Sequence, residues 1–414
     1  MVRLLIIADD FTGALDTGVQ FAARGARTCV ATDPAYDFSR ADAEAQVLVL
    51  DAETRHLRPE AAYGVVFRAV ENALKFGFTY IYKKTDSALR GNVGAELTAV
   101  MNAAGADSLA FIPALPKMNR VTRKGVHYID GVPVAQSVFG QDPFEPVRFS
   151  SVKEIVAAQS KTPVVLHEPG QAEAEPGIHV YDAETREDLQ KTGRALGREG
   201  LRLSAGCAGF AEVLAELLAL EGTPPGPPCL VPSLFVACGS VNPVTLRQMD
   251  EAEKAGFPRI HLTPAQKLES SWPETPDCGA AAAAWLEDAG RERRFILDVN
   301  DPAGCEDTAN YARERGLTTE DLRVRISSQL GRLIQRLLDQ GLDATLLCTG
   351  GDTLLALTRA VGVAELTPVC DLDTGAVLTN FVYMGKTYHI ISKSGGFGEP
   401  DLFIRLARSI GAGD

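Results

Sequence analysis

The sequence lacks several patterns that would place a chain in a well-known class of protein. Its eight cysteines form no CxxC pair and show no metal-like spacing with the six histidines. The cysteines therefore indicate neither a zinc site nor a disulfide framework, and free thiols fit a reducing cytosol. No GxGxxG motif is present, which weakens the case for a nicotinamide-dependent dehydrogenase.

A surplus of basic residues is also absent. The 414 residues carry a formal net charge of -13, which argues against nucleic acid or an anionic membrane surface as the main partner. The apolar run at residues 4–8 is too short for a signal peptide or a membrane span, so it predicts a strand. We expect a cytoplasmic protein that binds neither nucleic acid nor a membrane and that could form a homo-oligomer.

The length favours two or three domains, and the hydrophobic content of 45% is ordinary for a globular protein. Residues 222–228 read Gly-Thr-Pro-Pro-Gly-Pro-Pro, which can continue neither a helix nor a central strand. The sequence therefore predicts an N-terminal domain over residues 1–221, a linker over 222–228 and a C-terminal domain over 229–414.

Short apolar runs alternate with helical periodicity on both sides of this linker. The alternation predicts an α/β fold with two domains, each a mostly parallel sheet flanked by helices. Residues 125–134 predict a hairpin that turns at Asp130-Gly131, and residues 366–392 predict short, partly antiparallel strands. The expected parallel strands are residues 4–8, 47–50, 80–83, 109–112, 234–237, 259–262, 295–299 and 345–348.

A glycine-rich loop follows the last of these parallel strands. Gly350, Gly351, Asp352 and Thr353 lie between the strand and a helical pattern. The glycines let the backbone approach a ligand, and the free N–H groups of a helix start suit a phosphate oxygen. Asp352 cannot favour a bare anion, so it suggests a metal on the phosphates or a base near them. The alternative is an ordinary strand-to-helix turn that Asp352 caps.

Two other small-residue loops in the C-terminal half have the same character. Ser240 follows a strand in the segment Cys238-Gly239-Ser240, which suits a phosphate or a ribose. Lys393 precedes a loop that contains Gly395 and Gly396, and a cation amid glycines suits close contact with phosphate. The alternative for the second loop is a flexible glycine linker.

Two charged stretches follow strands in the N-terminal half. Asp9 and Asp10 lie at the carboxyl end of the first strand, where ligands bind in open α/β sheets. Paired carboxylates there can orient sugar hydroxyls or accept a proton from one. The alternative is that one aspartate caps the following helix and the other is solvated.

In the second stretch, Lys83, Lys84 and Arg90 bracket Asp86. The cations would hold the carboxylate of a small anionic substrate, and Asp86 would bind a hydroxyl. The alternative is a solvated run of charges. Two arginines from other loops could join the same pocket: Arg55 and Arg120.

Taken in order, these stretches resemble the four-carbon acid sugar kinase family, whose members are two-domain, ATP-dependent kinases of threonate, erythronate or 3-oxotetronate. The departures from the family pattern are Ala88 in place of threonine, Cys238 in place of serine and Asn119 in place of glycine, of which the first bears on substrate identity. The matching segments span nearly the full chain: residues 8–14, 84–92, 113–128, 239–240, 349–353 and 393–398.

The resemblance implies that the N-terminal domain binds the acid sugar and that the C-terminal domain binds ATP. The implied substrate contacts are Asp10, Arg55, Lys84, Asp86 and Ser87, to which the chemistry of the two charged stretches adds Asp9 and Arg90. The implied nucleotide contacts are Ser240, Gly350, Gly351, Asp352, Thr353, Gly395 and Gly396.

The resulting prediction is a transferase that uses ATP and Mg²⁺ to phosphorylate the terminal hydroxyl of a four-carbon acid sugar. Asp352 and Asp10 are the candidate catalytic residues, and no metal ligand is assigned. Residues 15–21 resemble the threonate kinase branch more than the 3-oxotetronate branch, so D-threonate is the preferred substrate. D-Erythronate and 3-oxotetronate are the alternative substrates. A non-catalytic sensor of an acid sugar or a nucleotide is the alternative from another class.

Overall fold

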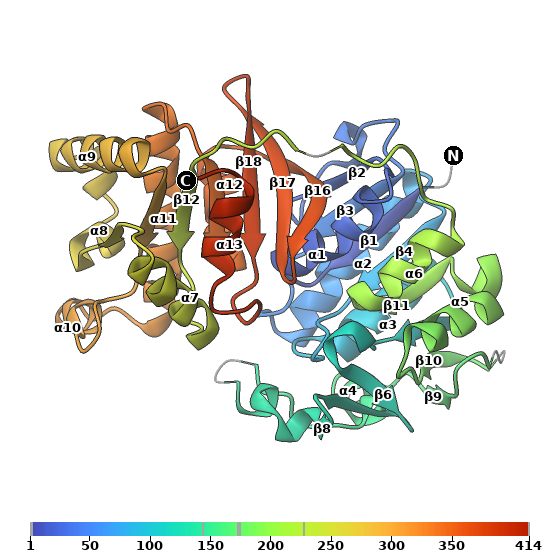
Figure 1. Ribbon diagram of the computed structural model, residues 1–414. Helices are drawn as coiled ribbons and strands as arrows, with labels where there is room; N and C mark the ends of the chain where they lie inside the picture. The colour runs from blue at the N-terminus through green and yellow to red at the C-terminus, as the bar shows by residue number, and fades with distance from the viewer. Residues whose placement is uncertain (1–2, 143–144, 172–174, 227, 413–414) are drawn as a thin grey trace. The chain divides into compact units, whose positions relative to one another are not determined.

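The computed structural model of the protein describes residues 3–142, 145–171, 175–226 and 228–412 (Figure 1). The chain divides into two compact units, Met1–Pro225 and Gly226–Asp414, and the division falls within the proline- and glycine-rich segment. Both units are built from a mostly parallel sheet and flanking helices, so the predicted α/β class is confirmed. No helix in the described parts of the chain is both long and apolar enough to cross a membrane.

The N-terminal unit is organised around a parallel sheet in the order β2-β3-β1-β4-β11-β5-β10-β9. The chain leaves β1 towards β2 and β3 on one side, and leaves β4 towards β5 on the other. This reversal opens the carboxyl ends of β1 and β4 to a ligand, because their connections run in opposite directions. The strands are β1 (Leu4–Ala8), β2 (Thr28–Ala31), β3 (Val47–Asp51), β4 (Tyr80–Lys84), β5 (Ser108–Ile112), β9 (Val164–His167), β10 (Gly177–Tyr181) and β11 (Leu203–Gly206).

Helices pack against each other in pairs on this unit: α2 contacts α3, and α1 contacts α6. The apolar side chains of β1, β3 and β4 that face α2 and α3 form a buried core. Leu5, Ile7 and Leu50, for example, have no solvent-exposed surface. The helices are α1 (Phe11–Ala22), α2 (Pro59–Lys75), α3 (Val93–Ala104), α4 (Val152–Ala157), α5 (Arg186–Gly200) and α6 (Ala208–Leu217).

The predicted hairpin is confirmed within a small antiparallel sheet of β6 (Arg120–Arg123), β7 (Val126–Ile129) and β8 (Val132–Pro133). Asp130 and Gly131 join β7 to β8 with φ angles of 50° and 79°. Two successive left-handed residues are what a tight turn between antiparallel strands requires, and an Asp-Gly pair adopts them readily.

The C-terminal unit has a sheet in the order β13-β14-β12-β15-β18-β17-β16. The pairs from β13 to β18 are parallel, and β18, β17 and β16 form an antiparallel meander. The antiparallel tail was therefore predicted correctly, but its strands are eight or nine residues long rather than short. The strands are β12 (Leu234–Cys238), β13 (Arg259–His261), β14 (Arg294–Asp298), β15 (Thr345–Thr349), β16 (Glu365–Asp373), β17 (Ala376–Tyr383) and β18 (Lys386–Lys393).

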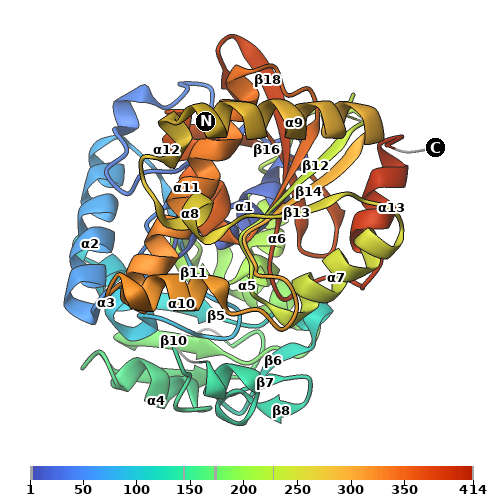
Figure 2. The same ribbon diagram turned by 90° about the vertical axis from the view of Figure 1, so that its left-hand side faces the viewer.

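The longest helix of this unit, α11, packs along α12 and is flanked by α8 and α9 (Figure 2). Its sequence predicts a helix because apolar residues recur at helical spacing and Thr318 with Asp321 forms a capping box at its start. The helices are α7 (Pro243–Lys254), α8 (Pro264–Leu268), α9 (Pro276–Glu292), α10 (Asp307–Glu314), α11 (Thr319–Asp339), α12 (Gly351–Ala360) and α13 (Leu402–Ser409).

Candidate functional site

The carboxyl ends of β1 and β4 bring the two predicted charged stretches together. The strands pair in parallel with Ala8 opposite Lys84, so Asp9 follows β1 beside the last residue of β4. The loop after β3 joins them because the backbone N–H groups of Thr54 and Arg55 donate to the Asp9 carbonyl. Segments that are far apart in the sequence thus meet at the point where the strand connections diverge.

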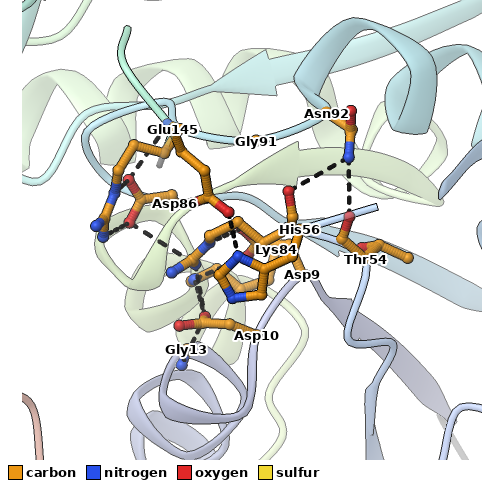
Figure 3. Close-up of polar contacts among 12 residues, drawn as sticks. Asp9, Asp10, Gly13, Thr54, His56, Lys84, Asp86, Gly91, Asn92 and Glu145 are labelled. Atoms are coloured by element: carbon orange, nitrogen blue, oxygen red, sulfur yellow. Dashed lines mark hydrogen bonds and ion pairs between the residues drawn. The ribbon is translucent and has the colours of Figure 1, made fainter. Parts of the chain in front are cut away.

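Arg55 is the centre of a charged cluster at this edge. Figure 3 labels four of the residues that surround it: Asp9, Asp10, Lys84 and Asp86. Its Nε donates to Asp9 Oδ2 at 2.7 Å, and its Nη2 lies 2.7 Å from Asp10 Oδ1. Lys84 Nζ lies 3.4 Å from Asp9 and 3.8 Å from Asp10, and Asp86 lies 3.8 Å from Arg55. We call Asp9, Asp10, Arg55, Lys84, Asp86 and Arg90 the charged cluster.

Four members of the cluster, Asp9, Arg55, Lys84 and Asp86, are buried yet charged. Burial opposes the charge of Asp9, but Arg55 and Lys84 hold its pKa well below the usual range. The pKa of Asp86 is also well below the usual range, because Arg90 and Arg55 outweigh the cost of burial. Burial alone would lower the pKa of Lys84, whereas Asp9 and Asp10 raise it. Mutual pairing therefore keeps full charges in a place with little water.

Asp10 also caps α1, since its Oδ1 accepts a hydrogen bond from the Gly13 N–H at 3.0 Å. The alternative of one capping and one solvated aspartate is thus half correct. Asp10 is the cap, but Asp9 is only 2% exposed and is bound by Arg55 and Lys84. The two neighbouring carboxylates both belong to the charged cluster.

Asp86 organises the loop that follows β4. Arg90 binds it in a bidentate manner, with Nε at 2.8 Å from Oδ2 and Nη2 at 3.1 Å from Oδ1. The Asp86 carboxylate also accepts from the Ala88 N–H at 3.2 Å, which fixes the turn. Ala88 itself is fully buried in the hydrophobic core.

Ser87 is held from the small antiparallel sheet. The Arg120 guanidinium donates to Ser87 Oγ, and His127 Nε2 lies 2.9 Å from the Ser87 carbonyl oxygen. The other ring nitrogen of His127 contacts Thr122 Oγ1 at 3.0 Å. Arg120 thus joins the site as expected. His127 was missed by the sequence reasoning, and its place in the matching segment 113–128 was the signal that could have indicated it.

Lys83 does not join the charged cluster, contrary to the expectation that both lysines bracket Asp86. Its Nζ binds Glu96 at 2.9 Å and donates to the carbonyls of Ile7 and Lys84, and its side chain has no exposed surface. Successive side chains of a strand point to opposite faces, so Lys83 and Lys84 cannot both reach one pocket.

Two further contacts support the same edge and were not predicted. Asn92 Nδ2 donates to the carbonyls of Thr54 and Leu57, each at 2.8 Å, which fixes the loop that carries Arg55. His56 pairs with Glu145 next to this loop (Figure 3).

In the C-terminal unit the three small-residue loops lie side by side at the carboxyl ends of β12, β15 and β18. The parallel register places Cys238 opposite Thr349 and Thr349 opposite Lys393. A Cβ built at Gly395 would lie 2.9 Å from Ser240 Oγ, and one at Gly239 would lie 2.0 Å from the Thr353 hydroxyl. These approaches bring the predicted nucleotide residues together within their own unit.

Helix α12 begins without a side-chain cap. Gly350 is the N-cap residue, with φ 89°, and no side chain bonds to the first turn. The alternative in which Asp352 caps this helix is therefore wrong. Asp352 instead lies in the first turn, half exposed, with its Oδ2 3.0 Å from Arg323 Nη1 of α11. An uncapped helix start next to Gly351 leaves backbone donors for an anion.

Lys393, at the end of β18, stabilises the loop that contains Gly395 and Gly396. Its Nζ donates to Thr245 Oγ1 at 2.7 Å and to the Gly395 carbonyl at 3.1 Å. Burial lowers the pKa of Lys393 to about 8. Gln248 adds a second support, because its Nε2 lies within 3.0 Å of the carbonyl oxygens of three consecutive residues: Phe397, Gly398 and Glu399.

A chain of polar contacts behind Ser240 was also missed. Asn300 Nδ2 donates to the Ser240 carbonyl at 3.1 Å and to Asp298 Oδ1 at 2.8 Å. Asp298 is fully buried and accepts from Arg259 through Nε and Nη2. A carboxylate at the end of a predicted strand was the signal in the sequence. In the described parts of the chain, no group of three or more His, Cys, Asp or Glu side chains could hold a metal ion.

Both units match known protein families. Residues 4–214 match the family model described as a sugar-binding N-terminal domain, and residues 235–403 match the one described as a nucleotide-binding C-terminal domain. The fold also matches a solved structure of a protein from Salmonella typhimurium LT2, with a TM-score of 0.81 at 21% sequence identity. The match covers 99% of this chain and 100% of the solved chain. That likeness concerns the fold alone.

Curated relatives match over nearly their whole length. The chain is 30% identical to a D-threonate kinase of Salmonella typhimurium, with 96% of each chain covered. It is 32% identical to a D-threonate kinase of Bordetella bronchiseptica, over 98% of this chain and 96% of the relative. It is 28% identical to a D-erythronate kinase of Heliobacterium modesticaldum, over 97% of this chain and 95% of the relative. The chain therefore belongs to the family of four-carbon acid sugar kinases.

Proposed function

We propose that this protein transfers the γ-phosphoryl group of ATP to the terminal hydroxyl of a four-carbon acid sugar, with D-threonate as the preferred acceptor. The observation that carries the proposal is the charged cluster of the N-terminal unit. It combines ionised carboxylates with a lysine and arginines at the edge of the sheet where ligands of α/β proteins bind.

The charged cluster suits a small molecule that has one carboxylate and several hydroxyls. Lys84 and Arg55 would hold the carboxylate, because both remain charged while nearly buried. Asp10 and Asp86 would accept hydrogen bonds from hydroxyls, with Ser87 and Arg90 completing the set. Buried polar partners discriminate well, since a ligand without the matching hydroxyl would leave them unpaired.

The C-terminal unit would hold the nucleotide. The first-turn N–H groups of α12, which begins at Gly351 after the N-cap Gly350 and has no side-chain cap, suit the phosphates of ATP. Ser240, Thr353 and the loop with Gly395 and Gly396 would surround these phosphates. Phosphoryl transfer needs positioning and charge neutralisation more than covalent help from the protein. Preformed loops of backbone N–H groups supply the positioning.

Asp352 is our candidate ligand for a magnesium ion carried by ATP. Kinase Mg²⁺ is held by one or two carboxylates together with phosphate oxygens, so a cluster of three protein ligands is not needed. Asp352 fits this requirement, because it lies half exposed in the first turn of α12 beside the glycines. When bound, the ion would neutralise charge on the phosphates. Asp352 could instead accept the proton of the substrate hydroxyl, and Asp10 is the second candidate for that role.

A coupled ADP-release assay tests the proposed activity. D-Threonate, D-erythronate, L-threonate and 3-oxotetronate would be compared by kcat/KM at fixed ATP and Mg²⁺, and we expect D-threonate to give the highest value. A tenfold preference for the keto acid, about 1.4 kcal/mol of transition-state discrimination, would overturn the choice of acceptor. Binding of an acid without turnover of any would favour the non-catalytic sensor.

A further inference from the structure

The position of Gly13 in α1 is unusual for a capped helix. With Asp10 as N-cap, Gly13 is the third helical residue. This position often carries Glu or Gln, which bonds back to the N-cap residue. Three other helices of this protein have such a reciprocal capping box, formed by Asp188, Gln266 and Asp321 at the equivalent place. Glycine there also costs helix stability relative to alanine.

The structure shows what occupies the place of the missing side chain. A Cβ built at Gly13 would lie 2.1 Å from Lys84 Nζ and 2.9 Å from Lys84 Cε. The lysine ammonium therefore fills the volume of a side chain over the first turn of α1, where Asp9 and Asp10 hold it against the positive end of the helix dipole.

We propose that Gly13 is a positioning residue for Lys84: the absence of its side chain creates the space in which the ammonium reaches the acid-sugar site. The same Cβ would also lie 2.5 Å from Asp10 Oδ1. That conflict is minor, because acidic caps and a third-position Cβ coexist in ordinary capping boxes, and a small rotation of the carboxylate separates them. Lys84 belongs to β4 and not to α1, so its ammonium would have to leave the position over the first turn of α1 when a Cβ is present at Gly13.

A double-mutant cycle of Gly13→Ala and Lys84→Ala tests this assignment. In the otherwise unchanged protein, Gly13→Ala should lower Tm and raise KM for the acid about tenfold, with KM for ATP unchanged. In the Lys84→Ala background the same change should leave KM for the acid as it is and leave Tm equal or higher, since alanine favours the helix. Gly64→Ala in α2 is the matched control, because its Cβ would meet only the Arg68 guanidinium at 3.4 Å.

Equal effects of Gly13→Ala in both backgrounds would overturn the proposal, as would an unchanged KM for the acid in the single variant. If Gly13→Ala alone fails to fold, the double variant must recover folded protein, and failure to do so would also overturn it. The KM comparison rests on the proposed function. The Tm comparison does not, so loss of coupling in Tm contradicts the role of Gly13, whereas absence of turnover with normal Tm coupling contradicts the activity alone.

Discussion

Single residues in this protein owe their roles to partners that are distant in the sequence. Lys83 and Lys84 are adjacent, but one is locked to Glu96 in the interior and the other to Asp9 at the strand end. Arg55 binds Asp9 across 46 positions of the chain. Changes at such residues therefore have separable effects on binding, on the reaction and on folding.

Asp352 and Asp10 are expected to differ in which kinetic constant they control. Asp352→Asn should lower kcat by at least about 100-fold with little change in binding of the acid, because its role concerns the transferred group. Asp10→Asn keeps a good helix cap and should mainly raise KM for the acid. Single-turnover rates and acid affinity for both variants decide the point. The general base would be Asp10 if Asp352→Asn kept near-normal turnover while Asp10→Asn lost turnover but still bound the acid.

Removal of Lys84 or Arg55 should weaken binding of the acid more than it slows phosphoryl transfer. Lys84→Ala is expected to raise KM for the acid, by about tenfold or more, while kcat falls less, because the carboxylate is remote from the reacting hydroxyl. Arg55→Ala should do the same and should also lower Tm, since three carboxylates lose a shared partner. Steady-state kinetics with thermal unfolding measure both effects. An equal loss of kcat in both variants would place these cations at the transferred group instead.

His127 predicts a pH dependence of stability. Burial lowers its pKa from 6.5 to about 4, with the nearby Arg120 adding to the effect and Asp86 opposing it. Between these pH values the unfolded chain binds a proton that the folded protein does not, so stability falls as the pH drops from 6.5 towards 4, by about 3 kcal/mol in total.

The comparison variant is His127→Gln, whose amide can still donate to the Ser87 carbonyl. Asp51 and Glu96 have raised pKa values and contribute with the opposite sign in the same range, but they are common to both proteins and cancel in the difference. Urea unfolding at several pH values should show a steeper loss in the unchanged protein. Parallel pH profiles would contradict the assignment.

At the scale of elements, the loop after β18 depends on one side chain of α7. The fully buried Gln248 donates to the carbonyls of Phe397, Gly398 and Glu399. Gln248→Ala should lower the free energy of unfolding by about 1–3 kcal/mol and raise KM for ATP, since the loop with Gly395 loses its support. Gln248→Glu should be worse, because it faces the carbonyls with a carboxylate. Denaturant unfolding and ATP kinetics test this, and KM for the acid serves as the internal control.

The elements themselves show where local sequence is informative. The hairpin at Asp130-Gly131 was predicted, because its turn signal lies within a few residues. Strands β9, β10 and β11 were missed. His179 and Ser204 interrupt the apolar residues of β10 and β11, and β9 has an apolar run of only three residues, so pairing with neighbouring strands decides their structure.

At the scale of the whole molecule, we expect each unit to be stabilised locally by its own ligand, the acid sugar in the N-terminal unit and the nucleotide in the C-terminal unit. Hydrogen exchange with D-threonate alone should slow in the loops after β1, β3 and β4. A non-hydrolysable ATP analogue with Mg²⁺ should instead slow exchange in the loops after β12, β15 and β18. The unliganded protein is the reference for both. Protection of the C-terminal loops by the acid alone would contradict the assignment of the two ligands to the two units.

The sequence by itself determined the α/β class, the parallel strands that end in acids or glycines, and the order of motifs that places the chain among acid sugar kinases. Those features rest on local rules: side-chain periodicity, turn residues and chemistry at strand ends. Only the tertiary structure decided that Lys84 rather than Lys83 faces the site, that Asp352 pairs with Arg323, and that Gly13 makes room for an ammonium. Strand order and helix packing bring these groups together, and no local pattern encodes the distances between segments that are remote in the chain.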